Sequence, residues 1–291
     1  MIIKRTGKRT LVFRLVVSVV LLAVIGGYGY ASYLYVGNQN RANDAKQAAI
    51  LEETTKLSIA SAKTALKKQP VYITLPGAQP IRAIVDDYSL TGSIWALVSR
   101  TSPISTDYIP EDLIIPNVST RTDKSSAERS VRADIETPLI NMFAAANDAG
   151  YSLMIGSGYR SAAQQQIYLD SAAASVGLEV ANQTIAIPGQ SEHQTGLAVD
   201  ISTTARNCYL DTCFADTSDG QWLVQNSYKY GFILRYQKGK ESISGYNYEP
   251  WHFRYVGVDL ATALHDSNLT LDEAWSYLKD ADDTLRANGA I

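Results

Sequence analysis

The amino-acid sequence predicts an α+β fold in which helices pack against an antiparallel sheet, preceded by a transmembrane helix and a helical stalk. Helix and strand signals follow one another in mixed order after residue 95, without the regular alternation of a parallel α/β fold. A long uncharged apolar run lies near the N-terminus, and a stretch rich in Ala, Lys, Glu and Leu follows it. These three observations define the predicted architecture.

The apolar run from Leu15 to Val36 contains 22 residues and no charge. As a helix it can cross a hydrocarbon core of roughly 30 Å. Five basic residues and no acidic one lie in the tail at 1–14, and the positive-inside rule therefore places that tail in the cytoplasm. We expect a single-pass membrane protein whose remaining chain is extracellular. A cleaved secretory signal is the alternative, and it leads to the same side of the membrane.

The charge of the chain argues against nucleic-acid binding. The whole sequence has 26 basic and 29 acidic residues, a net charge of −3. Without the five bases of the tail, 21 basic residues face 29 acidic ones, a balance of −8. An acidic body of this kind does not suit binding to a phosphate backbone.

Residues 37–69 are predicted to form the stalk. Asn43 to Lys68 lacks Gly and Pro and ends before Pro70, which indicates a helix, and Glu52 with Lys56 forms a favourable i,i+4 pair. Residues 70–94 change to β-branched and aromatic types interrupted by Gly and Pro, which predicts a small β-rich linker region. A compact domain is expected from 95 to 291.

Local signals predict the main elements of that domain. We expect a helix that begins at the Thr137-Pro138 pair and ends at Gly150, a helix capped by Ser161, and a last helix opened by a capping box. The predicted strands are Tyr151 to Ile155, Leu197 to Ile201 and Phe232 to Tyr236, and the capping box is Thr270 to Glu273.

Two of the three histidines stand near carboxylates. His193 precedes Asp200 by seven residues, and Glu249 precedes His252 by three. Two imidazoles and one carboxylate are a common catalytic zinc set that leaves one position open. The remaining Glu249 can then move a proton from water to a leaving amine. His265 stands apart and is predicted to lie at a helix end.

Three separated sequence blocks carry a family resemblance. SGYRS at 157–161, SEHQTGLAVDI at 191–201 and EPWHFRY at 249–255 resemble the signature blocks of zinc D-alanyl-D-alanine carboxypeptidases of the VanY type. That type belongs to the wider lysostaphin and D-Ala-D-Ala metallopeptidase group, with a Hedgehog/DD-peptidase-like fold. Together with the lead-in at 98–113, the resemblance covers about 95–265. It implies removal of the terminal D-alanine from peptidoglycan stem peptides.

The resemblance implies a role for each matching residue. His193, Asp200 and His252 would bind one Zn²⁺ ion, and Glu249 would be the catalytic acid and base. The chain would then be a serine-independent metallopeptidase.

Other matching positions imply contacts to substrate. Arg160 would hold the substrate and polarise the carbonyl whose oxygen becomes negative in the tetrahedral intermediate. Gln165 and Ser191 match positions that this group uses for substrate contacts. Ala162 and Ala163 depart from the bulkier residues expected there, which leaves the choice between pentapeptide and tetrapeptide stems open.

Cys208 and Cys213 form a short insertion after the predicted metal ligand at 200. In an oxidising compartment they can pair as a disulfide that borders the site. Two unpaired thiols and a zinc knuckle are the alternatives, the knuckle being weak because no second pair or nearby His accompanies it.

Several other functions are compatible with the same residues. A D,D-dipeptidase, an L,D-carboxypeptidase or a cross-bridge endopeptidase would use the same catalytic groups. A non-catalytic wall-binding module would be expected to lack Glu249 or Arg160, and both are present. A protein that docks partners through its stalk is the third class, and its partners are not specified by the sequence.

Overall fold

The computed structural model describes residues 41–67 and 69–291. The predicted cytoplasmic tail at 1–14 and the predicted transmembrane anchor at 15–36 lie outside the described residues. Among the helices that are described, none combines the length and hydrophobicity that a bilayer span requires. The described residues fall into two units, one that ends at residue 62 and one that spans residues 63–291.

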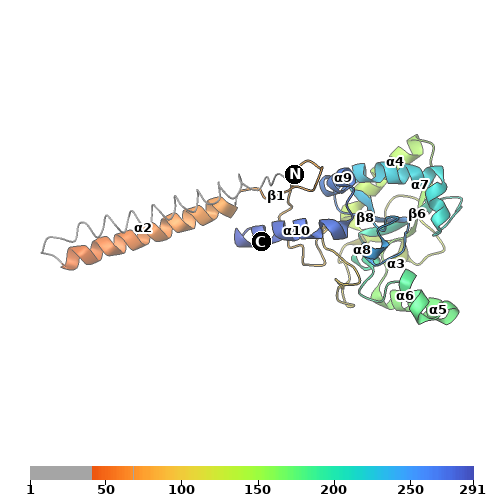
Figure 1. Cartoon of the computed structure of the whole chain (residues 1–291), viewed down its shortest axis with the longest axis horizontal. Coiled ribbons are helices and arrows are strands. Elements are labelled where there is room, and N and C mark those ends of the chain that lie inside the picture. Colours follow the sequence, from red (N-terminus) through yellow and green to blue (C-terminus); the bar gives the residue numbers. More distant parts are fainter. Residues whose placement is uncertain (1–40, 68) are drawn as a thin grey trace, which may run out of the picture. The chain divides into compact units, whose positions relative to one another are not determined.

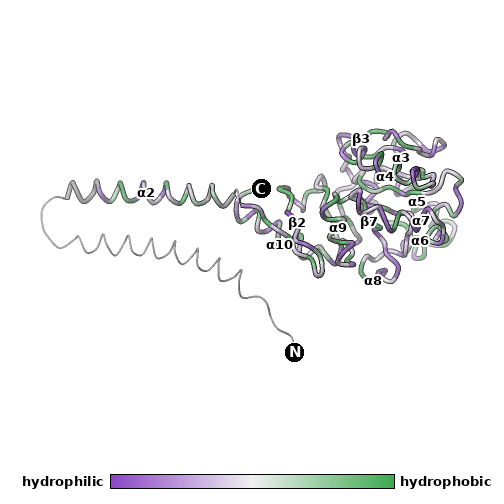
Figure 2. Tube along the Cα trace, turned by 90° about the horizontal axis from the view of Figure 1, so that it is seen from above, coloured by the Kyte–Doolittle hydropathy of each residue, from purple (hydrophilic) through white to green (hydrophobic). Residues whose placement is uncertain are grey.

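Helix α2 (Arg41–Lys67) corresponds to the predicted stalk. Its Glu52 and Lys56 form the expected i,i+4 ion pair, with 2.5 Å between Nζ and the carboxylate oxygen. Polar and apolar residues alternate along the helix without a continuous apolar stretch (Figure 2). The helix therefore depends on good local helix formers rather than on one broad hydrophobic face.

The second unit is built around a four-stranded antiparallel sheet with strand order β5-β6-β8-β7. Its two central strands, β6 and β8, lie side by side in Figure 1. Its strands are β5 (Leu153–Ser157), β6 (Ala198–Thr203), β7 (Phe232–Leu234) and β8 (His252–Tyr255). The α+β class predicted from the sequence is confirmed. Strand β6 is buried along its whole length, as expected for a strand with a neighbour on each side and helices on the sheet.

Helices and two small two-stranded antiparallel sheets surround the central sheet. The small sheets are β1 (Tyr72–Ile73) with β2 (Ile81–Arg82) and β3 (Leu113–Ile114) with β4 (Val131–Arg132). The helices are α3 (Ser126–Arg129), α4 (Glu136–Asp148), α5 (Ala162–Val176), α6 (Leu178–Thr184), α7 (Ser218–Asn226), α8 (Glu241–Ser244), α9 (Val258–Ser267) and α10 (Leu271–Ala287).

The sequence signals locate most helix starts. Ser161 caps α5 by accepting from the Gln164 backbone N–H, and Thr270 opens α10 with a complete capping box, both as predicted. Helix α4 differs, because it begins at Glu136, directly after a 3₁₀ turn, without a side-chain cap. Pro138 therefore lies inside the first turn, where its missing N–H needs no intrahelical partner.

Two hydrophobic clusters form the core of this unit. One lies between the sheet, α4 and α7, and includes Leu139, Met142, Val199 and Phe253. The other joins the segment at 70–94 to helices α9 and α10.

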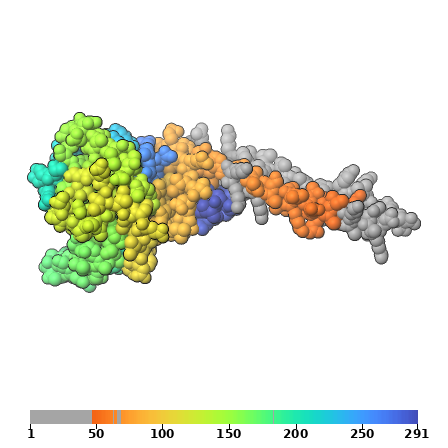
Figure 3. All heavy atoms as spheres, turned by 180° about the vertical axis from the view of Figure 1, so that it is seen from behind, coloured from red at the N-terminus to blue at the C-terminus, as the bar shows by residue number. Residues whose placement is uncertain are grey.

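The segment at 70–94, which the sequence marks as a β-rich linker, contributes directly to this second cluster. Its Tyr88 is buried beside Trp95, with ring centroids 5.0 Å apart. The indole N–H of Trp95 donates to the Val256 carbonyl at 2.8 Å, and Asp282 on α10 accepts from the Tyr88 backbone N–H at 3.1 Å. This segment and α10 lie against one another on the surface shown in Figure 3.

Candidate active site

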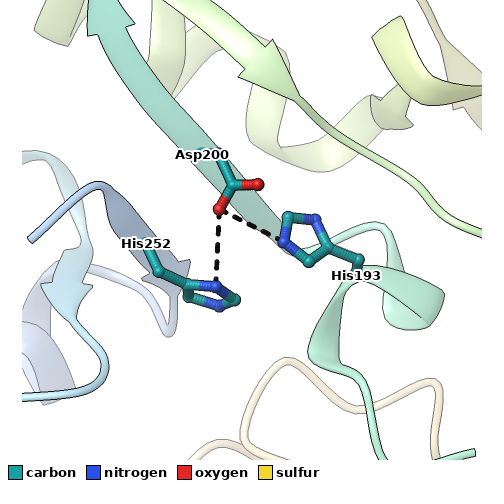
Figure 4. Close-up of side chains that lie close together, drawn as sticks. All are labelled: His193, Asp200 and His252. Atoms are coloured by element: carbon teal, nitrogen blue, oxygen red, sulfur yellow. Dashed lines mark ion pairs between the residues drawn. The ribbon is translucent and has the colours of Figure 1, made fainter. Parts of the chain in front are cut away.

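His193, Asp200 and His252 converge on one buried point (Figure 4). The Oδ1 atom of Asp200 lies 3.3 Å from Nε2 of His193 and 3.5 Å from Nδ1 of His252. One ligand atom from each residue lies within 4.8 Å of the other two. All three side chains are almost completely buried.

Strand register brings these groups together. Asp200 on β6 pairs directly with His252 on β8, and on its other side it pairs with Ser157 on β5. Paired residues on neighbouring antiparallel strands point to the same face of a sheet. The pairing therefore places two of the converging side chains beside each other on one face.

The third side chain comes from a 3₁₀ turn, Glu192–Thr195, that precedes β6. Gly196 ends this turn in the left-handed conformation, with φ of 70°. A Cβ atom there would lie 3.0 Å from Cγ of Arg132, so the position favours glycine both by conformation and by space. This tight reversal lets His193 lean back over the strand that carries Asp200.

The tautomer of His193 follows from its hydrogen bond. Its Nδ1 atom lies 2.6 Å from the Gly158 carbonyl oxygen, which can only accept, so Nδ1 carries the proton. The lone pair of Nε2 then faces Asp200. Burial lowers the pKa of the ring below its ordinary value, which favours this neutral form.

His252 has a carboxylate on each side. Its Nδ1 atom faces Asp200, while its Nε2 atom lies 3.5 Å from Oε2 of Glu192. Glu192 is fully buried and accepts from Arg235 and Arg254, each at 2.8 Å. Burial alone raises the pKa of Glu192, but the two guanidinium groups outweigh it and hold that pKa well below the ordinary value.

Glu249 lies beside the converging groups. Its Oε2 atom is 3.5 Å from Nδ1 of His252, and 16% of its side chain is exposed. Burial raises the pKa of this carboxyl, although the contact with His252 works against the shift. Glu249 thus has the position and partial access to water that a proton-transfer group needs.

Arg160 follows the end of β5 and reaches the same place. Its Nη2 atom donates to Oγ of Ser157 at 3.0 Å and lies 3.6 Å from Oδ2 of Asp200. Its Nη1 atom donates to Oε1 of Gln165 at 3.1 Å, and the amide nitrogen of Gln165 donates in turn to the Ala186 carbonyl at 2.7 Å. Gln165 therefore holds the guanidinium in place.

All seven site residues predicted from the sequence line one cavity of about 300 Å³. They are Arg160, Gln165, Ser191, His193, Asp200, Glu249 and His252. His265 lies near the end of α9 and stacks on Tyr228, with ring centroids 3.8 Å apart, as its predicted place at a helix end implies.

Several residues of this site are not singled out by the sequence. Ser157 and Glu192 belong to the matching blocks, but nothing in the blocks indicates their contacts. Tyr236 packs on His252 at 4.7 Å between ring centroids, and it comes from the end of a predicted strand that carries no motif. Lys124 and Tyr168 line the cavity from segments without a chemical signal.

The structure joins Cys208 and Cys213 in a disulfide. Tyr209 and Leu210, which lie between them, line the same cavity. The insertion therefore borders the site.

The three converging residues fit a zinc ion. The Oδ1 atom of Asp200 is buried and has no hydrogen-bond partner among the described residues, a costly arrangement unless another group satisfies it. Two imidazole nitrogens and one carboxylate oxygen are donors that zinc prefers, and three protein ligands leave a fourth position open. His193, Asp200 and His252 could thus hold a metal ion.

Comparison with known proteins agrees with this geometry. A family model described as VanY, D-alanyl-D-alanine carboxypeptidase, matches residues 128–258. YodJ of Bacillus subtilis (strain 168), which is named as a carboxypeptidase, is 43% identical over 187 residues, covering 64% of this chain and 68% of YodJ. A D-alanyl-D-alanine carboxypeptidase of Enterococcus faecalis (strain ATCC 700802 / V583) is 34% identical, covering 61% of this chain and 63% of that protein.

Two solved structures are similar as well. The LdcB LD-carboxypeptidase has a TM-score of 0.61 and 42% identity, covering 64% of this chain and 87% of that one. A VanY D,D-pentapeptidase variant from a VanB-type resistance cassette, in complex with Zn(II), has a TM-score of 0.52 and 33% identity. That match covers 63% of this chain and 98% of the other.

Proposed function

We propose that this chain, which belongs to the VanY family of D-alanyl-D-alanine carboxypeptidases, uses one zinc ion to remove the terminal D-alanine from peptidoglycan stem peptides. Family membership rests on the match at 128–258 and on 43% identity to a relative of which the chain covers 68%. The chain is accordingly a hydrolase of the VanY type. The observation that supports the zinc-dependent reaction best is the convergence of His193, Asp200 and His252 on one buried point beside Glu249.

Each residue of the cavity has a role in this reaction. Zinc, when bound by His193, Asp200 and His252, supplies Lewis-acid polarisation and makes water easier to deprotonate near neutral pH. Glu249 takes a proton from the attacking water and delivers it to the departing amine nitrogen. Its raised pKa suits both halves of this transfer, because the carboxylate is then a stronger base toward water and, once protonated, keeps the proton until the amine departs.

Arg160 acts on the oxygen of the scissile carbonyl. Its guanidinium is always charged and is held by Ser157 and Gln165, so it can donate to that oxygen as negative charge develops without reorganising. Ser191 and Gln165 also line the cavity and would contact the bound substrate.

A second candidate is an L,D-carboxypeptidase, which cuts the terminal D-alanine from a tetrapeptide stem. The observation in its favour is the similarity to the LdcB LD-carboxypeptidase, with 42% identity and a TM-score of 0.61. The two activities differ in the chirality of the residue before the scissile bond. The catalytic groups named above serve either reaction.

One experiment tests the proposal and separates the candidates. The purified body, starting after residue 36, is assayed for metal content and for release of D-alanine from synthetic pentapeptide and tetrapeptide stems. One zinc per chain and release from the pentapeptide support the D,D-carboxypeptidase. Release from the tetrapeptide alone supports the L,D activity, and hydrolysis of free D-Ala-D-Ala without release from either stem would identify a D,D-dipeptidase. Absence of any release from a zinc-loaded protein would overturn the catalytic proposal.

We further propose that residues 15–36 anchor the protein in the cell membrane with the catalytic domain outside. The support is the uncharged run of 22 residues preceded by five basic residues. A chain that lacks residues 1–36 should leave the membrane fraction, while in intact cells the full-length catalytic domain should be digested by added protease. Protection of the domain in intact cells would contradict this orientation.

A further inference from the structure

The loop at 206–213 forms one wall of the substrate cavity. Tyr209 and Leu210 line that cavity together with Arg160 and Glu249. The Leu210 side chain stays 38% exposed. An aromatic ring and an aliphatic side chain provide an apolar surface, which suits the methyl and methylene groups of an alanyl peptide.

The backbone conformation of this loop is one that its residues do not favour by themselves. Arg206, Cys208 and Leu210 have φ values of 59°, 56° and 50°, in the left-handed region that residues with a Cβ rarely adopt. Asn268, at the end of α9, is the one other non-glycine residue with positive φ in the described part of the chain. Such a backbone persists only where surrounding contacts impose it.

One imposing contact is the packing of Tyr209 on strand β5. The Tyr209 hydroxyl donates to the Gly156 carbonyl at 3.3 Å. A Cβ atom at Gly156 would lie 2.8 Å from Cε2 of Tyr209, so the ring lies directly on the glycine backbone. The guanidinium carbon of Arg121 lies 4.7 Å from the centre of the same ring.

The strand under Tyr209 leads directly to the catalytic groups. Gly156 lies in an irregularity of the β5–β6 pairing, between Ile155 and Ser157. The next residue, Ser157, accepts from Arg160. Tyr209 thus covers the backbone immediately before the residue that positions the guanidinium.

The other imposing contact is the Cys208–Cys213 disulfide, which closes the loop at both ends of the Tyr209-Leu210 wall. Both cysteine residues are only half-buried, so the loop end that carries them is partly open to solvent. The three predicted metal ligands come from the 3₁₀ turn at 192–195, β6 and β8, and none comes from the loop.

We propose that the Cys208–Cys213 disulfide is a redox-sensitive clasp that keeps Tyr209 and Leu210 in place as a substrate-binding wall. The inference rests on the proposed carboxypeptidase function. A dithiol reductant breaks the sulfur–sulfur bond, two thiols form with two electrons and two protons from the dithiol, and the dithiol becomes a disulfide. The freed loop relaxes from its left-handed backbone, the wall opens, and the enzyme binds its stem peptide more weakly while the metal site stays intact.

The test compares KM, kcat and zinc content of the zinc-loaded body before and after reduction by dithiothreitol, with mass spectrometry confirming the two added hydrogens. We expect KM to rise by about 10-fold while kcat changes less than about twofold, the pattern of lost substrate binding rather than lost chemistry. Zinc content should stay at its starting value. The Cys208→Ser/Cys213→Ser double variant should have the raised KM without any reductant, and dithiothreitol should not change its KM.

Two single variants show whether loss of the Tyr209-Leu210 wall causes the rise in KM. Tyr209→Ala should raise KM in the oxidised protein, whereas Tyr72→Ala, at an exposed tyrosine on β1 that does not line the cavity, should keep the wild-type value. An unchanged KM after complete reduction overturns the proposal. A zinc content that stays low after the dithiol, itself a zinc ligand, has been removed and zinc added back overturns it as well. If the double variant does not fold, the reduced wild type still decides the result.

Failure of the proposed function has a different signature. In that case the oxidised, zinc-loaded protein releases no D-alanine from any stem peptide. Amide hydrogen exchange then tests whether the disulfide holds the loop in place. Exchange at 204–217 should become faster on reduction, while exchange at β6 should stay unchanged. Equal exchange of the loop in both redox states overturns the clasp whatever the enzyme cuts.

Discussion

The Nε2 atom of His252 lies 3.5 Å from Oε2 of Glu192, on the side of the ring away from Asp200. Both atoms are buried, and neither has another hydrogen-bond partner among the described residues. Glu192 is itself held by two buried guanidinium groups. The pair therefore fixes which nitrogen of His252 faces the candidate metal position, as a carboxylate behind a histidine ligand does in many zinc sites.

Glu192→Gln should weaken zinc binding by about 10- to 100-fold, because the amide orients the imidazole less strongly than the carboxylate does. Zinc affinity is measured by competition with a chelator on folded protein. The matched control is Asp272→Asn, which loosens Arg235 from the far side without touching His252. It should lower the melting temperature but keep wild-type zinc affinity. Equal zinc affinity of Glu192→Gln and the wild type would show that Glu192 has only a structural role.

Glu249→Ala should retain zinc and lose at least about 10²-fold in kcat, the usual scale for a general acid–base group. The measurements are metal content after gel filtration and D-alanine release at saturating substrate. Glu111→Gln, which changes an exposed glutamate away from the cavity, serves as the control and should keep wild-type turnover. Near-normal kcat in Glu249→Ala would exclude the assigned proton transfer.

His193→Ala should lose both zinc and activity, because it removes one of three candidate ligands. His265→Ala is the matched control, since this histidine is exposed at the end of α9. That variant should bind zinc and release D-alanine as the wild type does. A fully loaded and active His193→Ala protein would rule out ligation by this residue.

Arg160→Lys should lower kcat by about 10²- to 10³-fold, the range seen when one donor to a developing oxyanion is lost. Lysine keeps the charge but cannot reach Ser157, Gln165 and the substrate with one planar group. Arg82→Lys, at an exposed arginine on β2, should leave kcat unchanged. If Arg160→Lys keeps normal kcat, the positive charge alone stabilises the oxyanion. The paired hydrogen bonds of the guanidinium group are then not required.

Glu128 should make the fold sensitive to acid. Burial raises its pKa, but hydrogen bonds from Lys124, Tyr168 and Ser125 outweigh this effect and lower the pKa to about 2. The native state therefore binds fewer protons than the unfolded state, whose carboxyl has a pKa near 4.5. Its stabilising contribution is complete above about pH 4.5 and is lost as the pH falls toward 2.

Thermal unfolding followed from about pH 5 down to about pH 2 measures this contribution, because that range covers the loss of the stabilising charge. In Glu128→Gln the melting temperature should fall less steeply with decreasing pH than in the wild type. Glu111→Gln provides the control and should follow the wild-type slope. Identical slopes for Glu128→Gln and the wild type would contradict the stabilising role of the carboxylate.

Local chemistry explains what could be predicted from the sequence. Helix caps act within a few residues, so Ser161 and Thr270 mark the starts of α5 and α10 correctly. The matching blocks contain six of the seven predicted residues of one cavity, and Gln165 lies on the helix that follows the first block. The proline after Thr137 is misleading, because the 3₁₀ turn before α4 replaces the expected cap. The membrane anchor remains a prediction from composition and charge alone.

By itself the sequence determined the α+β class, the helix that became α2 and the chemical groups that meet in the cavity, because composition, caps and motifs are properties of neighbouring residues. Only the tertiary structure decided which neighbouring residues position these chemical groups. Pairing of β6 with β8 places Asp200 opposite His252, and Glu192 meets Arg254 from 62 residues away. Tyr88 packs on α10 across 194 residues. Such contacts depend on how distant segments share buried space, which no local pattern encodes.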